Sequence, residues 1–238
     1  MATVPQQRRT REIEYPSGDG KPMAETELHL EEMIDTIQVL QDHFAAQPRV
    51  HVCGNLLLYY EEGNPRKHVS PDVMVTLDVP KKPLRDYYLV WKEGKAPDFV
   101  VEMTSKSTKH EDQKQKWVIY RDILRVSEYF LYDPRADYLD PPLQGYELVA
   151  GEYVPIDPIA GQLPSAVLGL CLERDGTKLR LSDPASFPRL PTRLEACEAA
   201  EHRAEEPRRR AEVAEAAQQR LAEENERLRR EIETLRRG

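Results

Sequence analysis

With 238 residues, 39% of them hydrophobic and 32% charged, the chain has room for one domain of ordinary size and a polar extension. A formal net charge of -8 argues against a protein that holds nucleic acid by bulk electrostatic attraction, although a local basic patch can still meet it transiently. The three cysteines are odd in number and lack metal-ligand spacing, and no apolar run approaches the ~20 residues that span a membrane, so we expect a cytoplasmic protein without a membrane segment.

Composition divides the chain into four parts. Residues 1–21 are polar and lack the apolar centre of a secretory signal, so we expect a flexible leader. Residues 22–182 have the mixed composition of a folded domain, and residues 183–193 form a proline-containing linker. Residues 194–238 consist largely of Ala, Glu and Arg with occasional Leu, which predicts a helical, coiled-coil tail.

The domain begins with a predicted helix over residues 24–44, where apolar residues recur at helical spacing after the possible cap Thr26. Strand-like runs follow at residues 49–61, 70–79 and 97–104. A second helix is expected over residues 110–124, with an apolar stripe of Trp117, Tyr120, Ile123 and Leu124. Next come a short strand within residues 127–134 and a hairpin over residues 145–156 that turns at Ala-Gly. This order predicts an α/β fold, a mixed central sheet with at least one crossover helix.

An acid in the third run requires an explanation, because Glu102 lies between Val101 and Met103 in an apolar strand. A buried carboxylate is costly unless it is paired, and backbone N–H groups, an Arg or a metal ion could each satisfy it. Asp98 is a poor partner, since four strand residues span roughly 13 Å and we expect this acid to face water at the strand entrance. Asp72 is better placed, because residues 76–96 are long enough to fold back and pair the two strands.

Four motifs in order, "SPDVMV", "DFVVEMTSKST", "DQKQKWVIY" and "SEYFLYDP", resemble the Uma-type restriction endonuclease family within the PD-(D/E)XK nuclease-like superfamily. The resemblance extends over roughly residues 22–170. It implies a restriction-endonuclease-like core with a mixed sheet flanked by helices, and DNA cleavage dependent on Mg²⁺ or Mn²⁺. Asp72 and Glu102 match the two metal-binding acids of the family. Two carboxylates are also the hard oxygen ligands that suit Mg²⁺.

The catalytic lysine of the superfamily normally follows the second acid by two residues, where this chain has Thr104. The resemblance implies a substitute on the following helix, and Asp112, Lys116 and Tyr120 fit its Asp-x-x-x-Lys-x-x-x-Tyr pattern. Lys114 is the competitor, and on an α-helix it points about 160° away from Lys116. Because Lys116 lies one turn before an apolar residue, we predict that Lys116 faces the site.

Further residues could contribute from both sides of the acids. Glu27 could supply a third acid from the first helix, or be an acid favoured by the helix dipole. His29 could reach the site or simply pack on its helix. Lys106, Lys109 and Arg121 are candidate DNA contacts, and the alternative is that they form a solvated surface.

The tail carries a heptad repeat. Leu221, Leu228 and Leu235 occupy the d positions, and Asn225 and Ile232 fall at a positions. A single Asn at an a position among leucines favours a parallel, two-stranded coiled coil, so we predict a homodimer, with a heterotypic partner helix or a lone polar helix as alternatives. Pro207 is expected to interrupt the helix, leaving it regular from about Arg208.

Two functions follow from these features. The first is a metal-dependent DNA endonuclease in which Asp72 and Glu102 bind the metal ion and Lys116 assists the attacking water. The second is a catalytically weak nuclease-like module that binds DNA or partners and assembles through its coiled coil. Separation of the two acids, or exposure of both candidate lysines, would favour the second.

Overall fold

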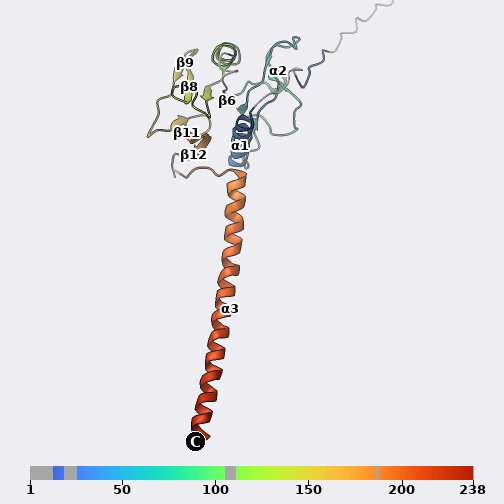
Figure 1. The fold of residues 1–238 in the computed structure, drawn as a ribbon. Helices are drawn as coiled ribbons and strands as arrows, with labels where there is room; N and C mark the ends of the chain where they lie inside the picture. The colour runs from blue at the N-terminus through green and yellow to red at the C-terminus, as the bar shows by residue number, and fades with distance from the viewer. Residues whose placement is uncertain (1–12, 19–25, 105–110, 186–187, 238) are drawn as a thin grey trace, which may run out of the picture. The chain divides into compact units, whose positions relative to one another are not determined.

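The computed structural model describes residues 13–18, 26–104, 111–185 and 188–237, and the chain divides into two compact units, Met1–Leu190 and Pro191–Gly238 (Figure 1). The elements of the first unit are α1 (Glu27–His43), β1 (Val50–Cys53), β2 (Leu58–Tyr59), β3 (His68–Val69), β4 (Val73–Leu77), β5 (Tyr88–Leu89), α2 (Val90–Glu93), β6 (Phe99–Met103), the π-helical segments η1 (Glu111–Lys116) and η2 (Ile119–Leu124), β7 (Glu128–Tyr132), β8 (Leu143–Val149), β9 (Glu152–Pro155), β10 (Leu163–Ser165), β11 (Leu170–Asp175) and β12 (Lys178–Ser182). The second unit contains α3 (Arg193–Arg237). In the part of the chain that the structure describes, no helix is both long and apolar enough to cross a membrane.

A six-stranded mixed sheet forms the centre of the first unit, in the order β1-β4-β6-β7-β8-β9. The pair β6 and β7 is parallel and the other neighbours are antiparallel. A parallel pair needs a crossover connection, which the helix between these two strands provides. The predicted fold class, a mixed sheet flanked by helices, is confirmed, as is the crossover helix.

The two faces of the sheet have separate cores, and strand alternation assigns each residue to one of them. Phe99, Val101 and Met103 of β6 pack in the core that contains α1 and the strands β10 to β12. Val100 packs in the other core, with Tyr120 of η2. Glu102 has the same parity as Val100, so it belongs to the face that the η1–η2 helix covers.

Local sequence explains how several of these elements begin and end. Thr26 caps α1, because its hydroxyl accepts a hydrogen bond from the His29 amide, as its position before the helix predicted. The predicted hairpin is β8 and β9, and its turn residues Ala150 and Gly151 have φ of +51° and +95°. Positive φ at both central positions is the geometry that matches the twist of paired strands.

The crossover helix differs from the prediction in its winding. Both η1 and η2 are π-helical, with α-helical geometry only between them. Hydrogen bonds from residue i to i+5 wind the backbone more widely than 3.6 residues per turn. The expected stripe therefore breaks: Tyr120 and Leu124 are buried, whereas Ile123 is 49% exposed.

Three parts of the first unit were not predicted. β10, β11 and β12 form an antiparallel sheet, and β3, β2 and β5 form a second small sheet. The segment 13–18 belongs to the expected flexible leader, but Tyr15 packs edge-on against Tyr59 and the Tyr59 hydroxyl donates to the Pro16 carbonyl at 2.6 Å. This part of the leader is therefore held on the domain.

The tail unit is one helix, α3, that runs through Pro207. The expected interruption at this proline is wrong. A proline removes one hydrogen bond and clashes with the preceding turn at a cost of about 3 kcal/mol, which a helix of 45 residues tolerates because the other turns remain bonded. Leu221, Leu228, Ile232 and Leu235 are exposed along it.

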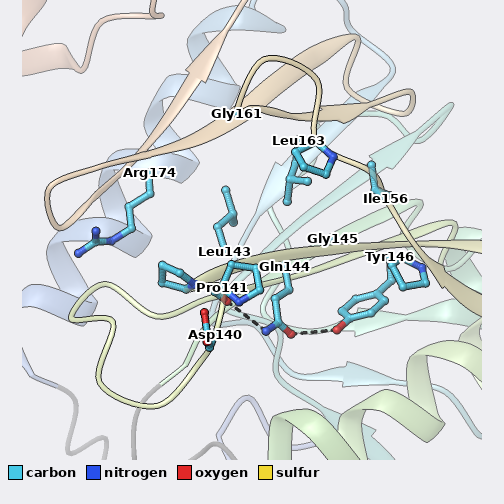
Figure 2. Close-up of a pocket in the computed structure, with 13 residues that line it drawn as sticks. Asp140, Pro141, Leu143, Gln144, Gly145, Tyr146, Ile156, Gly161, Leu163 and Arg174 are labelled. Carbon is cyan, nitrogen blue, oxygen red and sulfur yellow. Dashed lines mark hydrogen bonds between the residues drawn. The ribbon is translucent and has the colours of Figure 1, made fainter.

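A pocket of about 540 Å³ lies beside β8 and β9 on the first unit (Figure 2). Its wall is largely apolar, with Pro141, Ile156 and Leu163 among the lining residues, and Gln144 bridges the Pro141 carbonyl and the Tyr146 hydroxyl. Asp72, Glu102 and Lys116 do not line it. The candidate site is therefore elsewhere on the sheet.

Candidate active site

Asp72 and Glu102 lie together on neighbouring strands. Val73 of β4 pairs with Val101 of β6, and this antiparallel register places Asp72 beside Glu102. The Asp72 amide lies 3.4 Å from Glu102 Oε2, and the Met103 amide donates to Asp72 Oδ2 at 2.8 Å. The structure thus brings together the two acids that the sequence analysis paired.

Glu102 is fully buried, with 0% exposure. Lys116 Nζ donates to Oε2 at 2.8 Å and the Tyr120 hydroxyl donates to Oε1 at 2.6 Å. Both donors come from the same helix, one helical turn apart, so one element holds both oxygens of the carboxylate. These bonds offset the cost of burying the charge. Burial and the Glu102 charge together raise the pKa of Tyr120 well above its ordinary value, so its hydroxyl stays protonated as a donor.

The structure places the two candidate lysines differently. Lys116 is mostly buried and forms an ion pair with Glu102, whereas Lys114 is exposed. At the lysine position of the superfamily, Thr104 is buried and its hydroxyl lies 2.7 Å from that of Tyr138. The side chain of Asp112, the first residue of the helix pattern, lies outside the described residues.

The expectation that Asp98 faces water is wrong. Its side chain is only 15% exposed, and it bonds the Leu77 amide through Oδ2 and Lys95 Nζ through Oδ1, each at 2.8 Å. The reason lies in the sheet, because Leu77 ends β4 opposite Pro97, and its amide takes the neighbouring carboxylate as its acceptor. Asp98 is therefore a structural acid, separate from the pair at the other end of β6.

His29 approaches Asp72 from α1. It is 5% exposed, and its Nε2 lies 3.5 Å from Asp72 Oδ1. Burial alone would raise the pKa of Asp72, but the contact with His29, the charge of Lys116 and the Met103 amide outweigh it, and the pKa of Asp72 is lowered. Asp72 therefore stays ionised at neutral pH.

Glu27, the proposed third acid, is exposed in the first turn of α1. Two residues along an α-helix correspond to roughly 200° of rotation, so Glu27 and His29 project from opposite sides. The structure brings His29 to the acid pair and leaves Glu27 away from it. The buried face of α1, which includes Met33 and Leu40 with His29, is the signal that could have ranked the histidine first.

Gly54 is a residue of the site that the sequence analysis did not identify. A Cβ at this position would lie 1.9 Å from the Asp72 carbonyl oxygen. The next amide, of Asn55, donates to the Pro71 carbonyl at 2.8 Å. The backbone after β1 therefore packs directly against the segment that presents Asp72, and only glycine fits there.

The structure describes one of the three candidate DNA contacts, Arg121. Lys106 and Lys109 lie outside the described residues. Arg121 donates to Asp122 at 2.6 Å and to Glu152 at 2.9 Å. Its charge is thus shared with two acids of the same chain.

The donor set of the acid pair suits a divalent metal ion. Among the residues that the structure describes, no group of three or more His, Cys, Asp or Glu side chains is arranged to hold a metal ion. Mg²⁺ is commonly held by only one or two carboxylates, and it takes its other oxygen ligands from water and substrate phosphate. Two adjacent carboxylates, one of them partly open to solvent, meet that requirement.

The chain is similar to a solved structure and matches a family model. A solved structure from Anabaena variabilis ATCC 29413, described as "a putative nuclease belonging to DUF820", is similar over 62% of this chain and 76% of its own, with 17% identity and a TM-score of 0.46. No curated protein matches the chain. The model of the Uma2 family, described as "Putative restriction endonuclease", matches residues 3–173. The chain therefore belongs to the Uma2 family of restriction-endonuclease-like proteins, as its motifs predicted.

Proposed function

We propose that this protein is a metal-dependent DNA endonuclease whose site is formed by Asp72, Glu102 and Lys116. The observation that carries the proposal is the juxtaposition of these three side chains: two carboxylates on neighbouring strands, and an ammonium 2.8 Å from the buried one. Buried charges are costly, so a cluster of them at the end of two strands is more typical of a reaction site than of a structural one. Family membership supports the same activity.

Each residue would have a distinct task in phosphodiester hydrolysis. Asp72 and Glu102 would hold Mg²⁺ or Mn²⁺, which when bound supplies positive charge that polarises the phosphate and favours attack by water. Lys116 would orient that water and stabilise the negative charge that develops on the phosphate oxygens. Tyr120 and His29 would keep the two carboxylates in place. The water oxygen bonds to phosphorus, one phosphorus–ester oxygen bond breaks, and the departing oxygen takes a proton.

Plasmid cleavage by the purified protein tests this proposal. We expect nicking or linearisation with Mg²⁺ or Mn²⁺ and none with chelator. Glu102→Gln and Asp72→Asn should each lower the rate by at least about 100-fold, the scale of losing one charge-stabilising group. Asp98→Asn is the matched control, because this acid lies on the same segment but bonds Leu77 and Lys95 instead. Cleavage that survives Glu102→Gln would reject the mechanism.

A second candidate function, a catalytically weak module that binds DNA, is favoured by one observation. Thr104 stands at the superfamily's lysine position and is buried against Tyr138, so it supplies no charge to the site. Binding of duplex DNA without cleavage at any concentration of Mg²⁺ or Mn²⁺ would select this module. The adjacency of the two acids and the burial of Lys116 favour the endonuclease.

We also propose that the tail dimerises as a parallel coiled coil, linked to a nuclease-like domain at residues 22–182 through residues 183–193. The support is the apolar stripe of exposed leucines on α3 and the charges beside it. In a parallel pair, Glu224 at a g position would meet Arg229 of the partner at an e position, and Glu231 would meet Arg236 in the same way. A dimer would place two sites on one duplex, so that both strands could be cut.

Cys197 provides a test of this arrangement. It lies 28 residues before Asn225, a whole number of heptads, so it also falls at an a position and is exposed in the single chain. In a parallel dimer the two copies would face each other, and mild oxidation should give a covalent dimer that Cys197→Ser abolishes. A chain ending at Leu190 should sediment as a monomer. Dimers that persist in the truncated chain would refute dimerisation by the tail.

A further inference from the structure

The ammonium of Lys116 occupies a place that a metal ion would also favour. It lies 2.8 Å from Glu102 Oε2, the oxygen that the Asp72 amide approaches to 3.4 Å. One cation thus already balances the charge of the buried carboxylate. A divalent ion bound by the same pair would need Oε2 and would experience repulsion from this ammonium.

The side chain of Lys116 reaches solvent, whereas Tyr120, another donor to Glu102, is fully buried. Lys116 is 13% exposed, so part of it reaches solvent. Tyr120 is fully buried and bonds the opposite oxygen, Oε1. If Lys116 moves, the Glu102 carboxylate keeps the hydrogen bond from Tyr120, which preserves its orientation toward Asp72.

We propose that Lys116 is an internal counter-ion that competes with the metal ion for Glu102, and that metal binding releases its ammonium toward the substrate phosphate. This inference rests on the proposed function for the metal site, but it concerns affinity and not cleavage. In the absence of metal, the Lys116 ammonium reduces the repulsion between the two neighbouring carboxylates. With metal bound, the same ammonium becomes available to the phosphate and to the attacking water. Activity then requires two cations, the metal ion and the Lys116 ammonium.

Mn²⁺ binding to the full chain without DNA tests the competition, with the free ion followed by electron paramagnetic resonance. We expect Lys116→Met and Lys116→Gln to tighten Mn²⁺ binding at least tenfold, which corresponds to about 1.4 kcal/mol. Lys114→Met is the matched control, because this exposed lysine lies on the same helical segment, and it should change the affinity less than twofold. Asp72→Asn should weaken binding and so locate the ion.

A second measurement covers the case in which a variant is less stable than the wild type. A ligand that binds the folded state raises the melting temperature according to its affinity. The rise produced by a fixed Mn²⁺ concentration should therefore be larger for both Lys116 variants than for the wild type. Unchanged or weaker Mn²⁺ binding in both variants would overturn the inference.

The outcomes also separate this inference from the proposed function. Tighter Mn²⁺ binding in the Lys116 variants, together with a wild type that never cleaves DNA, would retain the competition and reject the nuclease. Cleavage by the wild type, together with unaltered Mn²⁺ affinity in the variants, would retain the nuclease and reject the competition.

Discussion

Replacing Tyr120 by phenylalanine removes one hydroxyl from the centre of the site and leaves the ring in place. The hydroxyl is fully buried and donates to Glu102 Oε1 at 2.6 Å, so the variant leaves a buried carboxylate oxygen without this donor. Hydrogen bonds to charged groups contribute about 1.5–3 kcal/mol, and neutral ones about 1 kcal/mol. We therefore expect Tyr120→Phe to lower the free energy of unfolding by about 2–3 kcal/mol.

Tyr153 provides a matched control within the same core. Its buried hydroxyl donates to a neutral acceptor, the Val126 carbonyl, at 3.0 Å, so Tyr153→Phe should cost about 1 kcal/mol. In a Glu102→Gln background the acceptor is neutral, and the cost of Tyr120→Phe should fall to a similar value. The difference between the two backgrounds is the coupling energy of the hydroxyl and the charge.

Urea unfolding of the four proteins of this cycle and of Tyr153→Phe at pH 7, followed by circular dichroism, measures these free energies. Equal costs for Tyr120→Phe and Tyr153→Phe, or no coupling to Glu102, would refute the conclusion that Tyr120 stabilises a buried charge. Tyr120→Phe should also weaken Mn²⁺ binding, because the carboxylate loses the contact that orients it.

Two further predictions concern the backbone behind the site and a buried imidazole. Gly54→Ala should destabilise the fold by about 1–3 kcal/mol and weaken Mn²⁺ binding, because its Cβ would meet the Asp72 carbonyl oxygen at 1.9 Å and displace that segment. Burial, helped by the charge of Arg85, lowers the pKa of His51 to about 4; its imidazole resonances should titrate there. Since the unfolded chain protonates this group near pH 6.5, the stability that His51 contributes is lost as the pH falls from about 6.5 to about 4.

Gly145→Ala is the control for Gly54→Ala. Its Cβ would lie 2.5 Å from the Phe130 ring, so a similar loss of stability is expected without a change in Mn²⁺ affinity. Wild-type stability of Gly54→Ala would contradict the packing argument. An imidazole of His51 that titrates near pH 6.5 in the folded protein would contradict the effect of its burial.

Much of the candidate site could be predicted from local pattern and connection length. The apolar run around Glu102 predicted a strand, and a connection of about twenty residues allowed the antiparallel return that pairs it with Asp72. The alternation of strand residues assigned Glu102 to one face of the sheet. The position of Lys116 one turn before Tyr120 placed these two side chains on the same side of their helix. These inferences hold because they depend on periodicities that the backbone imposes on neighbouring residues.

Other features depend on contacts between distant segments. Asp98 has the same strand parity as Glu102, yet its environment is set by the Leu77 amide at the end of β4, which donates to its carboxylate. His29 gains its place at Asp72 only when α1 packs on the sheet. The π-helical winding that exposes Ile123 has no signature in the pattern of apolar residues, which fits an α-helix equally well.

The sequence by itself determined the order of the strands of the central sheet and their crossover helix, the family, and which two acids and which lysine lie together. Only the tertiary structure decided what those groups contact. One helix holds both oxygens of Glu102, and a histidine rather than a third acid approaches Asp72. Gly54 makes room for the backbone of Asp72. The physical reason is that periodicity along the chain fixes the side of an element on which a residue projects. The distance to a partner depends on how separate elements pack.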